Sequence, residues 1–308
     1  MGSDSREQDE GYFPAATSIL HHIHSQRAVG MLYGQRALMV GARNPIAFIG
    51  TTEKSEARDR PWQRLVLTAN MFETVFFGTR AQANRALQRV HRLHEDANGT
   101  IPQAPGPYPA GTPYSAFDPE LMLWVIAPMY DSALVLYELL VTPLSDAERQ
   151  RFWEEYVRFG ELFGMPACYA PRTTAELDDW WRAQHAGRTF LTDYARGVGR
   201  SIATRLPLPV WARAPMRAGT QVLIGSLPPG VREQYGFDWT GGDEFAFRAI
   251  CAAHRATRSL IPESIRSGPC RQHYAQVARQ ERRNALAGKL GFGFPDELAV
   301  RAASGLDR

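Results

Sequence analysis

Two histidines lie three residues apart in the stretch TRAQANRALQRVHRLHEDANG, which runs from Thr79 to Gly99 and has the pattern of a helix. Residues at this spacing share one helical face, so His91 and His94 can reach a single bound object. Neutral imidazole is the commonest protein ligand of metal centres, and a haem iron needs only one axial donor from the protein. The pair is the first candidate for chemistry, with a solvated helix surface as the alternative.

The elements that must position this pair are helical throughout. Apolar residues at helical spacing predict one long helix or two short ones between Ser18 and Ala42, joined near Gly30 and Gly34. The five prolines between Pro102 and Pro113 preclude regular structure in that connection. Further helices are expected at about 60–78, 79–99, 121–141, 145–164, 174–192, 242–260 and 268–290, with short ones between 206 and 236.

No long strand alternation, internal repeat or composition break interrupts this pattern. The fold class is therefore predicted to be all-α, with a single mostly helical domain over residues 12–295. Residues 1–11 are expected to form a disordered tail, and residues 296–308 a C-terminal tail.

Composition excludes several classes of protein. The 308 residues carry a net charge of only +3, with 35 basic and 32 acidic side chains interleaved, so nucleic-acid binding is not expected. Three widely spaced cysteines form neither a disulfide framework nor a zinc pattern, and the polar, acidic first ten residues do not resemble a secretory signal. A cytoplasmic location fits best.

The apolar stretch from Leu121 to Val141 is long enough to span a bilayer, but its interior holds Pro128, Asp131 and Glu138. A carboxylate near mid-bilayer is unfavourable by a few kcal/mol, so a buried central helix is expected and no membrane span. Asp131 would then need a compensating donor.

Other conspicuous residues receive simpler interpretations. The HHIH cluster of His21, His22 and His24 resembles a metal chelator, but a solvated helix face is the preferred reading. The adjacent Trp180 and Trp181 are expected to cover core or interface. A basic turn near the C-terminus comprises Arg279, Arg282 and Arg283. A solvated helix face is the simplest interpretation, and a subunit contact or an acidic membrane surface are the alternatives.

Taken in order, the strings RALMVGARNPIAFIGTTEKS, DRPWQRLVLTANMFETVFFGTRAQANRALQRVHRLHEDANG and DPELMLWVIAPMYDS resemble the MpaB-type oxygenases and latex clearing proteins, the rubber oxygenase catalytic domain. The resemblance extends from about Tyr12 to Thr174 and more faintly to Pro269. It implies a helical, globin-like core, a haem b cofactor (iron protoporphyrin IX), and the use of dioxygen to cleave or oxidise carbon chains.

The resemblance also implies roles for individual residues. The family pattern of His followed five residues later by Gly falls on His94 and Gly99, so His94 is the expected proximal iron ligand. One helix cannot supply both opposed axial positions, so His91 is expected to meet a haem propionate or a neighbouring carboxylate. The family's Arg-Leu-x-x-Thr segment places Arg64 near a propionate or the distal network and Thr68 near dioxygen or water. A surface ion pair for Arg64 and core packing for Thr68 are the alternatives.

Several positions depart from the family pattern. The resemblance places Leu67 where latex clearing proteins have a distal lysine, so a lysine-capped iron is not expected here. Asn44, Lys54 and Ile126 occupy positions where relatives often have histidine, so a reshaped, more apolar pocket is expected. Glu53 is the nearest acidic residue to the first motif and a candidate for the base that the rubber-cleaving relatives use, with an exposed loop glutamate as the alternative.

These observations predict a haem b dependent oxygenase or oxidase that acts with dioxygen on a hydrophobic small molecule, prenylated or polyketide-like, in secondary metabolism. The alternatives are a non-catalytic haem-binding sensor or carrier and a haem-free lipid-binding protein; a homodimer is left open. The expected catalytic residues are Arg64, Thr68 and Glu53, and the expected cofactor-binding residues are His94, His91, Arg64, Trp124 and Asp131, with His94 as the metal ligand.

Overall fold

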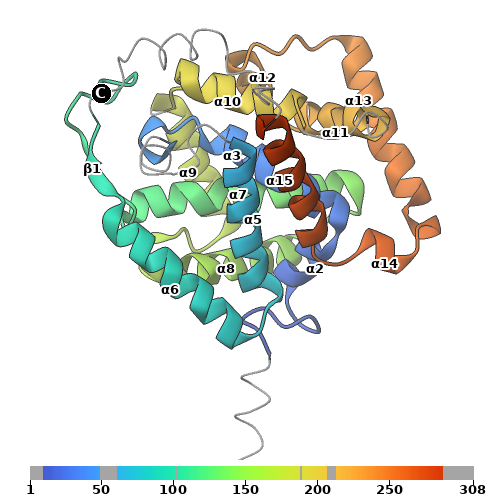
Figure 1. Cartoon of the computed structure of the whole chain (residues 1–308), viewed down its shortest axis with the longest axis horizontal. Coiled ribbons are helices and arrows are strands. Elements are labelled where there is room, and N and C mark those ends of the chain that lie inside the picture. Colours follow the sequence, from blue (N-terminus) through green and yellow to red (C-terminus); the bar gives the residue numbers. More distant parts are fainter. Residues whose placement is uncertain (1–9, 49–60, 102, 188, 207–212, 287–308) are drawn as a thin grey trace, which may run out of the picture.

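The chain folds into layers of helices with one small hairpin (Figure 1). The computed structural model describes residues 10–48, 61–101, 103–187, 189–206 and 213–286. Within them the elements are α2 (Ile19–Ser25), α3 (Arg27–Gly41), α5 (Pro61–Phe77), α6 (Arg80–Asp96), β1 (Asn98–Thr100), β2 (Pro113–Ser115), α7 (Pro119–Leu140), α8 (Asp146–Leu162), η1 (Ala167–Tyr169), α9 (Thr174–Gly187), α10 (Asp193–Thr204), α11 (Arg213–Gly225), α12 (Pro229–Gln234), α13 (Gly241–Thr257), η3 (Arg258–Leu260), α14 (Glu263–Arg266) and α15 (Arg271–Leu286). The all-α prediction is confirmed. The domain boundaries stay predictions.

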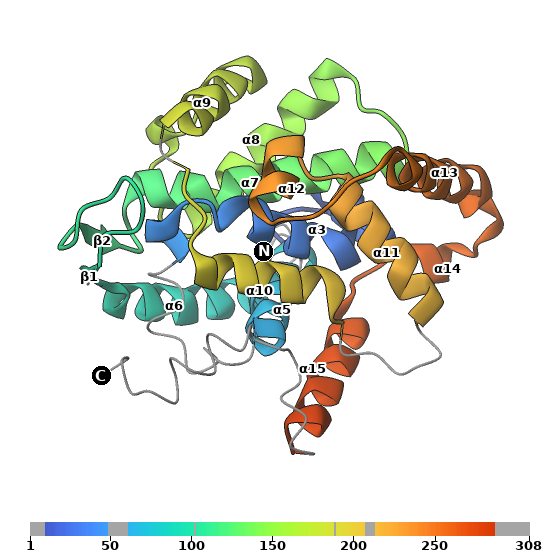
Figure 2. The same cartoon turned by 90° about the horizontal axis from the view of Figure 1, so that it is seen from above.

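Helix α7 forms the centre of the fold and packs along α3, with α8 and α13 beside it (Figure 2). It begins at Pro119 after the Asp118 side chain, which accepts backbone hydrogen bonds from the first turn. This helix is long and apolar enough to cross a membrane, but two thirds of its most apolar stretch is buried inside the protein. Its packing is that of the expected central core helix.

The one carboxylate in the middle of α7 finds the donor that its environment requires. The Arg36 guanidinium on α3 lies 2.5 Å from Asp131 and also donates to the Ser132 hydroxyl at 2.9 Å. The same guanidinium donates to the Ser226 carbonyl, so the almost fully buried Arg36 has all its partners within the core.

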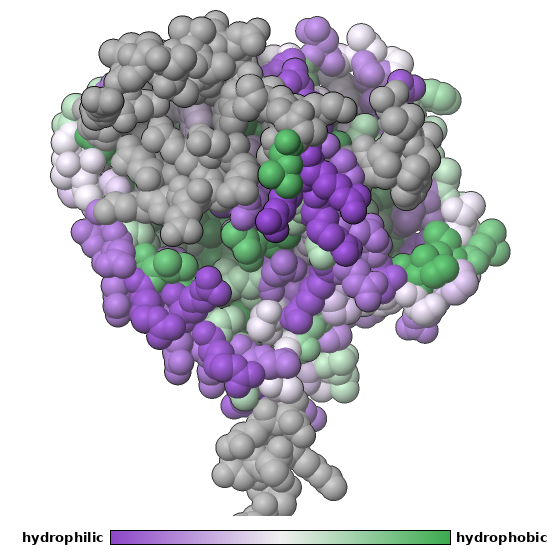
Figure 3. Space-filling view, in the orientation of Figure 1, coloured by the Kyte–Doolittle hydropathy of each residue, from purple (hydrophilic) through white to green (hydrophobic). Residues whose placement is uncertain are grey.

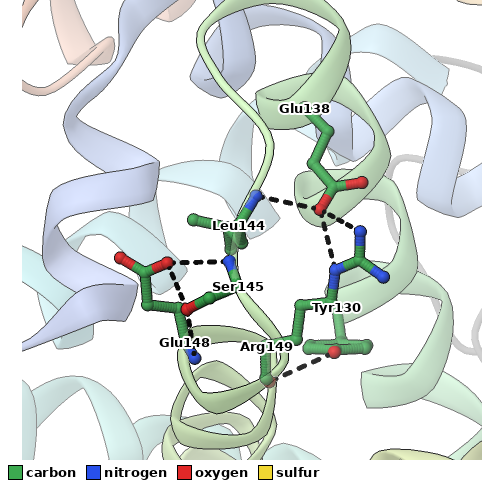
Figure 4. A network of polar contacts seen from close by, with 6 residues as sticks. All are labelled: Tyr130, Glu138, Leu144, Ser145, Glu148 and Arg149. Atoms are coloured by element: carbon green, nitrogen blue, oxygen red, sulfur yellow. Dashed lines mark hydrogen bonds and ion pairs between the residues drawn. The ribbon is translucent and has the colours of Figure 1, made fainter.

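The turn between α7 and α8 is held by a polar network (Figure 4). One carboxylate oxygen of Glu138 accepts hydrogen bonds from the Leu144 amide and from the Arg149 guanidinium. Ser145 and Glu148 cap the start of α8 reciprocally, as the capping-box pattern predicts. These contacts order the short connection between α7 and α8.

The structure corrects several sequence predictions of local detail. The break in the first helical region lies at Gln26, not near Gly30 or Gly34, since Gln26 has extended backbone angles and ends α2. The proline-rich connection is not wholly irregular: β2 pairs with β1 antiparallel, with Gly99 opposite Tyr114. Helix α10 was not anticipated, and α9 ends sooner than expected.

The interpretation of the HHIH cluster as a solvated face is wrong for one of its members. The side chain of His24 is buried, stacks on Phe76 with ring centroids 4.5 Å apart, and has Nε2 2.7 Å from the Tyr156 hydroxyl. His22 is exposed and contacts Tyr137. Among the residues that the structure describes, no group of three or more His, Cys, Asp or Glu side chains could hold a metal ion.

Candidate functional site

Helices α5 and α6 diverge from a tight turn and form the two arms of a V (Figure 1). Thr79 caps α6 in a reciprocal capping box with Gln82, which fixes the direction of the second arm. Arg64 lies 13 residues before the end of α5 and His94 lies 14 residues after the start of α6. At 1.5 Å per residue, both side chains stand roughly 20 Å from the turn, at the open end of the V.

The inner stripe of α6 changes from apolar to polar as the helices separate. Ala83 and Leu87 are buried in the main core near the turn, and Val90 packs against the same core. His91 and His94 continue this face, one turn apart, and both are half-buried. The helix therefore presents imidazoles where the neighbouring helix no longer covers it.

Helix α5 shows the same transition along residues four apart. Phe72 packs edge-on against Phe159 and Phe163 of the aromatic core. One turn towards the open end, Thr68 is exposed, and one turn further Arg64 is half-buried. The alternative in which Thr68 packs in the core is therefore wrong, and its hydroxyl is available to a ligand.

The surroundings of His94 favour a neutral imidazole. Its ring meets Phe117 edge-on, with centroids 5.6 Å apart, and its Nδ1 is buried without a hydrogen-bond partner. Burial lowers the pKa of His94, and the nearby charge of His91 lowers this pKa further. A neutral ring is the form that coordinates a metal.

His91 also contacts Phe117, with ring centroids 6.3 Å apart, but its polar contact lies elsewhere. Its Nε2 is 3.1 Å from the Leu162 carbonyl oxygen at the end of α8. This contact ties α6 to α8 and gives His91 a partner within the protein. Its predicted contact with a haem propionate stays a prediction.

Arg64 lies against aromatic rings at the start of α5. Its guanidinium carbon is 5.8 Å from the ring centroid of Phe48, which in turn packs against Tyr194 of α10. Burial lowers the pKa of Arg64, although an arginine remains charged at any physiological pH. A cation held against apolar rings is suited to bind an anionic group that arrives at the open end of the V.

The open end also exposes apolar surface. Leu67 and Leu93, the neighbours of Thr68 and His94, are 58% and 61% exposed. A porphyrin is flat and apolar with anionic propionates at one edge, so exposed leucines, a neutral imidazole and an arginine suit its different parts. The residues at the open end of the V thus fit a haem.

Trp124 is buried in the core of the fold, whereas Asp131 on the same helix is partly exposed. The Trp124 indole donates to the Gly41 carbonyl at 2.7 Å and packs against Trp180 and Trp181, as expected for two tryptophans that cover the core. Asp131 is paired with an arginine of α3. Contact of either residue with a cofactor stays a prediction, and Glu53 lies outside the described residues.

Asn44, one of the departures from the family pattern, and Pro128 in the central helix both have structural roles. The Asn44 side chain accepts hydrogen bonds from the amides of Ile46 and Ala47, so it caps the turn of helix at 45–48. Pro128 on α7 packs against Gly41, where α3 comes close. Sequence reasoning missed Phe117 and Phe48, because both lie outside long periodic segments and nothing in their spacing connects them to the histidines.

Comparisons with known proteins identify the family of the chain. The chain is 28% identical over 210 residues to the uncharacterised proteins Rv2237 of Mycobacterium tuberculosis and Mb2261 of Mycobacterium bovis, an alignment that covers 66% of this chain and 76% of each relative. No solved structure matches the chain significantly. Residues 21–256 match the family described as ER-bound oxygenase mpaB/B'/Rubber oxygenase, catalytic domain. The chain belongs to this family and is an oxygenase catalytic domain.

Proposed function

We propose that the protein is a haem b dependent oxygenase that uses dioxygen to oxidise a hydrophobic small molecule. The observation that carries the proposal is the position of His94: a half-buried imidazole with a lowered pKa, at the open end of the V, in a chain of an oxygenase family. Among the described residues, its ring is suited to hold a haem iron from one side.

The other residues at the site have distinct tasks in this proposal. Arg64 would bind a propionate through its planar guanidinium and so orient the macrocycle. Thr68 would hold an ordered water or a bound oxygen atom through its hydroxyl. Leu67 would present an apolar side chain where latex clearing proteins have a cation, which would suit a lipophilic substrate. The haem itself would supply the electron chemistry with dioxygen.

The substrate class follows from this apolar lining. A prenylated or polyketide-like compound of secondary metabolism is the proposed substrate, because Leu67 stands where relatives have a lysine and Ile126 stands where they often have a histidine. A haem-binding sensor or carrier is the second candidate, since Leu67 and the capping role of Asn44 remove polar groups from the site. Dioxygen-dependent loss of such a compound would exclude the second candidate.

The test is haem binding by the full chain produced with iron and a haem precursor. We expect a Soret band and about one haem per chain for the unchanged protein. His94→Gly should lose the haem, and added imidazole should restore the Soret band because it can enter the vacated space. His22→Gly, which changes an exposed histidine on α2, is the matched control and should keep its haem.

Two results would contradict the proposal. One is the absence of a Soret band from folded, unchanged protein. The other is a His94→Gly variant that keeps its haem content. A haem-free protein that retains lipid would support the alternative of a haem-free lipid-binding protein. Pigment analysis of the purified protein distinguishes this alternative from a haem protein.

A further inference from the structure

An apolar ridge projects from the surface where η3 meets α14. It consists of Leu260, Ile261 and Ile265, and we call it the α14 ridge. Leu260 is 80% exposed and Ile265 is 59% exposed, although both are large aliphatic side chains. The ridge accounts for the apolar area at the right edge of the surface in Figure 3, at the position of α14 in Figure 1. Contiguous exposed apolar residues of this kind mark interaction surfaces.

The α14 ridge is held firmly against the body of the protein. Arg27 of α3 donates hydrogen bonds to the carbonyls of Ser264 and Ile265 at 2.7 and 2.8 Å. The Gly268 amide donates to the Ser25 carbonyl at 2.7 Å, which ties the end of the segment to α2. The apolar side chains are therefore presented outward from a fixed backbone.

The backbone of the ridge is also internally paired. The amides of Ile261, Ile265 and Arg266 donate to carbonyls three or four residues earlier. Paired backbone groups lose little when they leave water, whereas unpaired ones are strongly unfavourable in an apolar medium. The ridge can therefore enter an apolar phase with little loss of backbone solvation.

The surroundings of the ridge are strongly basic. Between Arg248 and Arg283 the chain has eight arginines and two glutamates, and one of those glutamates, Glu281, is buried. Arg255 on α13 is exposed five residues before Leu260, and Arg266 directly follows Ile265. Apolar side chains that project from a basic surface are suited to a bilayer with anionic headgroups.

A second copy of this chain is a poorer occupant. In a two-fold dimer the same surface meets itself, so the arginines around the ridge would face one another. We propose that the α14 ridge docks the protein on an anionic lipid bilayer, with Leu260, Ile261 and Ile265 inserted among the acyl chains and the arginines against the headgroups. The interaction is peripheral and does not depend on the haem or on the reaction.

The test is cosedimentation of the full chain with vesicles of phosphatidylcholine, alone or mixed with phosphatidylglycerol. The protein should bind the mixed vesicles and not the neutral ones, and high salt should release it. Leu260→Ser with Ile265→Ser should weaken binding roughly tenfold or more, because two large apolar side chains no longer leave water. Arg255→Gln should weaken it about fivefold.

The matched control is Phe245→Ser, at the opposite end of α13. Phe245 is 76% exposed, but its neighbours Asp243 and Glu244 are acidic, so this variant should bind as the unchanged protein does. All variants change exposed side chains and should keep their melting temperatures. The proposal is overturned if the protein does not bind anionic vesicles or if the double variant binds as well as Phe245→Ser. It is also overturned if light scattering shows a dimer that the double variant dissociates.

Discussion

The ion pair between α3 and α7 offers a quantitative test of how the core is held together. Arg36 is 2% exposed and Asp131 is 31% exposed, with 2.5 Å between the guanidinium and the carboxylate. Removal of one partner of a buried pair destabilises by about 3–5 kcal/mol, since the other charge stays buried and uncompensated. Asp131→Ala leaves Arg36 with only the neutral oxygens of Ser132 and Ser226.

Because Asp131 is partly exposed, water already screens the pair, and the expected loss lies at the lower end, about 3 kcal/mol. Arg36→Met should cost less, since the carboxylate it leaves behind can reach water. The double variant Arg36→Met with Asp131→Leu should recover much of the loss, as it removes both charges. This order of effects follows from the unequal burial of the two side chains.

The assay is urea denaturation followed by circular dichroism and tryptophan fluorescence, with coincident transitions as the check on two-state unfolding. Asp179→Ala is the matched control, because Asp179 pairs with Arg182 on the exposed surface of α9. The control should lose less than about 1 kcal/mol. If Asp131→Ala and Asp179→Ala destabilise equally, the reasoning from burial is refuted.

Two further predictions concern buried side chains. Burial lowers the pKa of His24 to about 3, so the folded protein keeps this ring neutral while the unfolded chain takes up a proton below about pH 6.5. The free energy of unfolding should therefore fall by roughly 2 kcal/mol between pH 6.5 and 5. His24→Phe should flatten this slope, measured by urea denaturation at a series of pH values. Gly199→Ala should destabilise by about 1–3 kcal/mol, because a Cβ there would lie 2.4 Å from the Tyr235 ring; Gly230→Ala, with no atom within 4 Å of its Cβ, should be nearly neutral in the same assay.

Sequence patterns predicted the local features whose interacting residues lie close together along the chain. A capping box is closed within four residues, so Thr79 with Gln82 and Ser145 with Glu148 mark the starts of α6 and α8 locally. Asp131 was recognised as a group in need of a donor, but its partner comes from another helix, and no local pattern identifies Arg36. The helix break at Gln26 was not predicted, because glutamine has no strong tendency to end a helix; its extended backbone is set by how α2 and α3 pack.

The amino-acid sequence by itself determined the all-α class, the helix of the paired histidines and the family resemblance, since each depends on residue type and spacing along the chain. Only the tertiary structure decided that His94 and Arg64 both lie about 20 Å from the turn between α5 and α6. It also decided that His91 contacts the end of α8 and that His24 is buried. The reason is physical: periodicity specifies which face of a helix is apolar, whereas the packing of other helices decides how much of that face is covered. The candidate site lies where that cover ends.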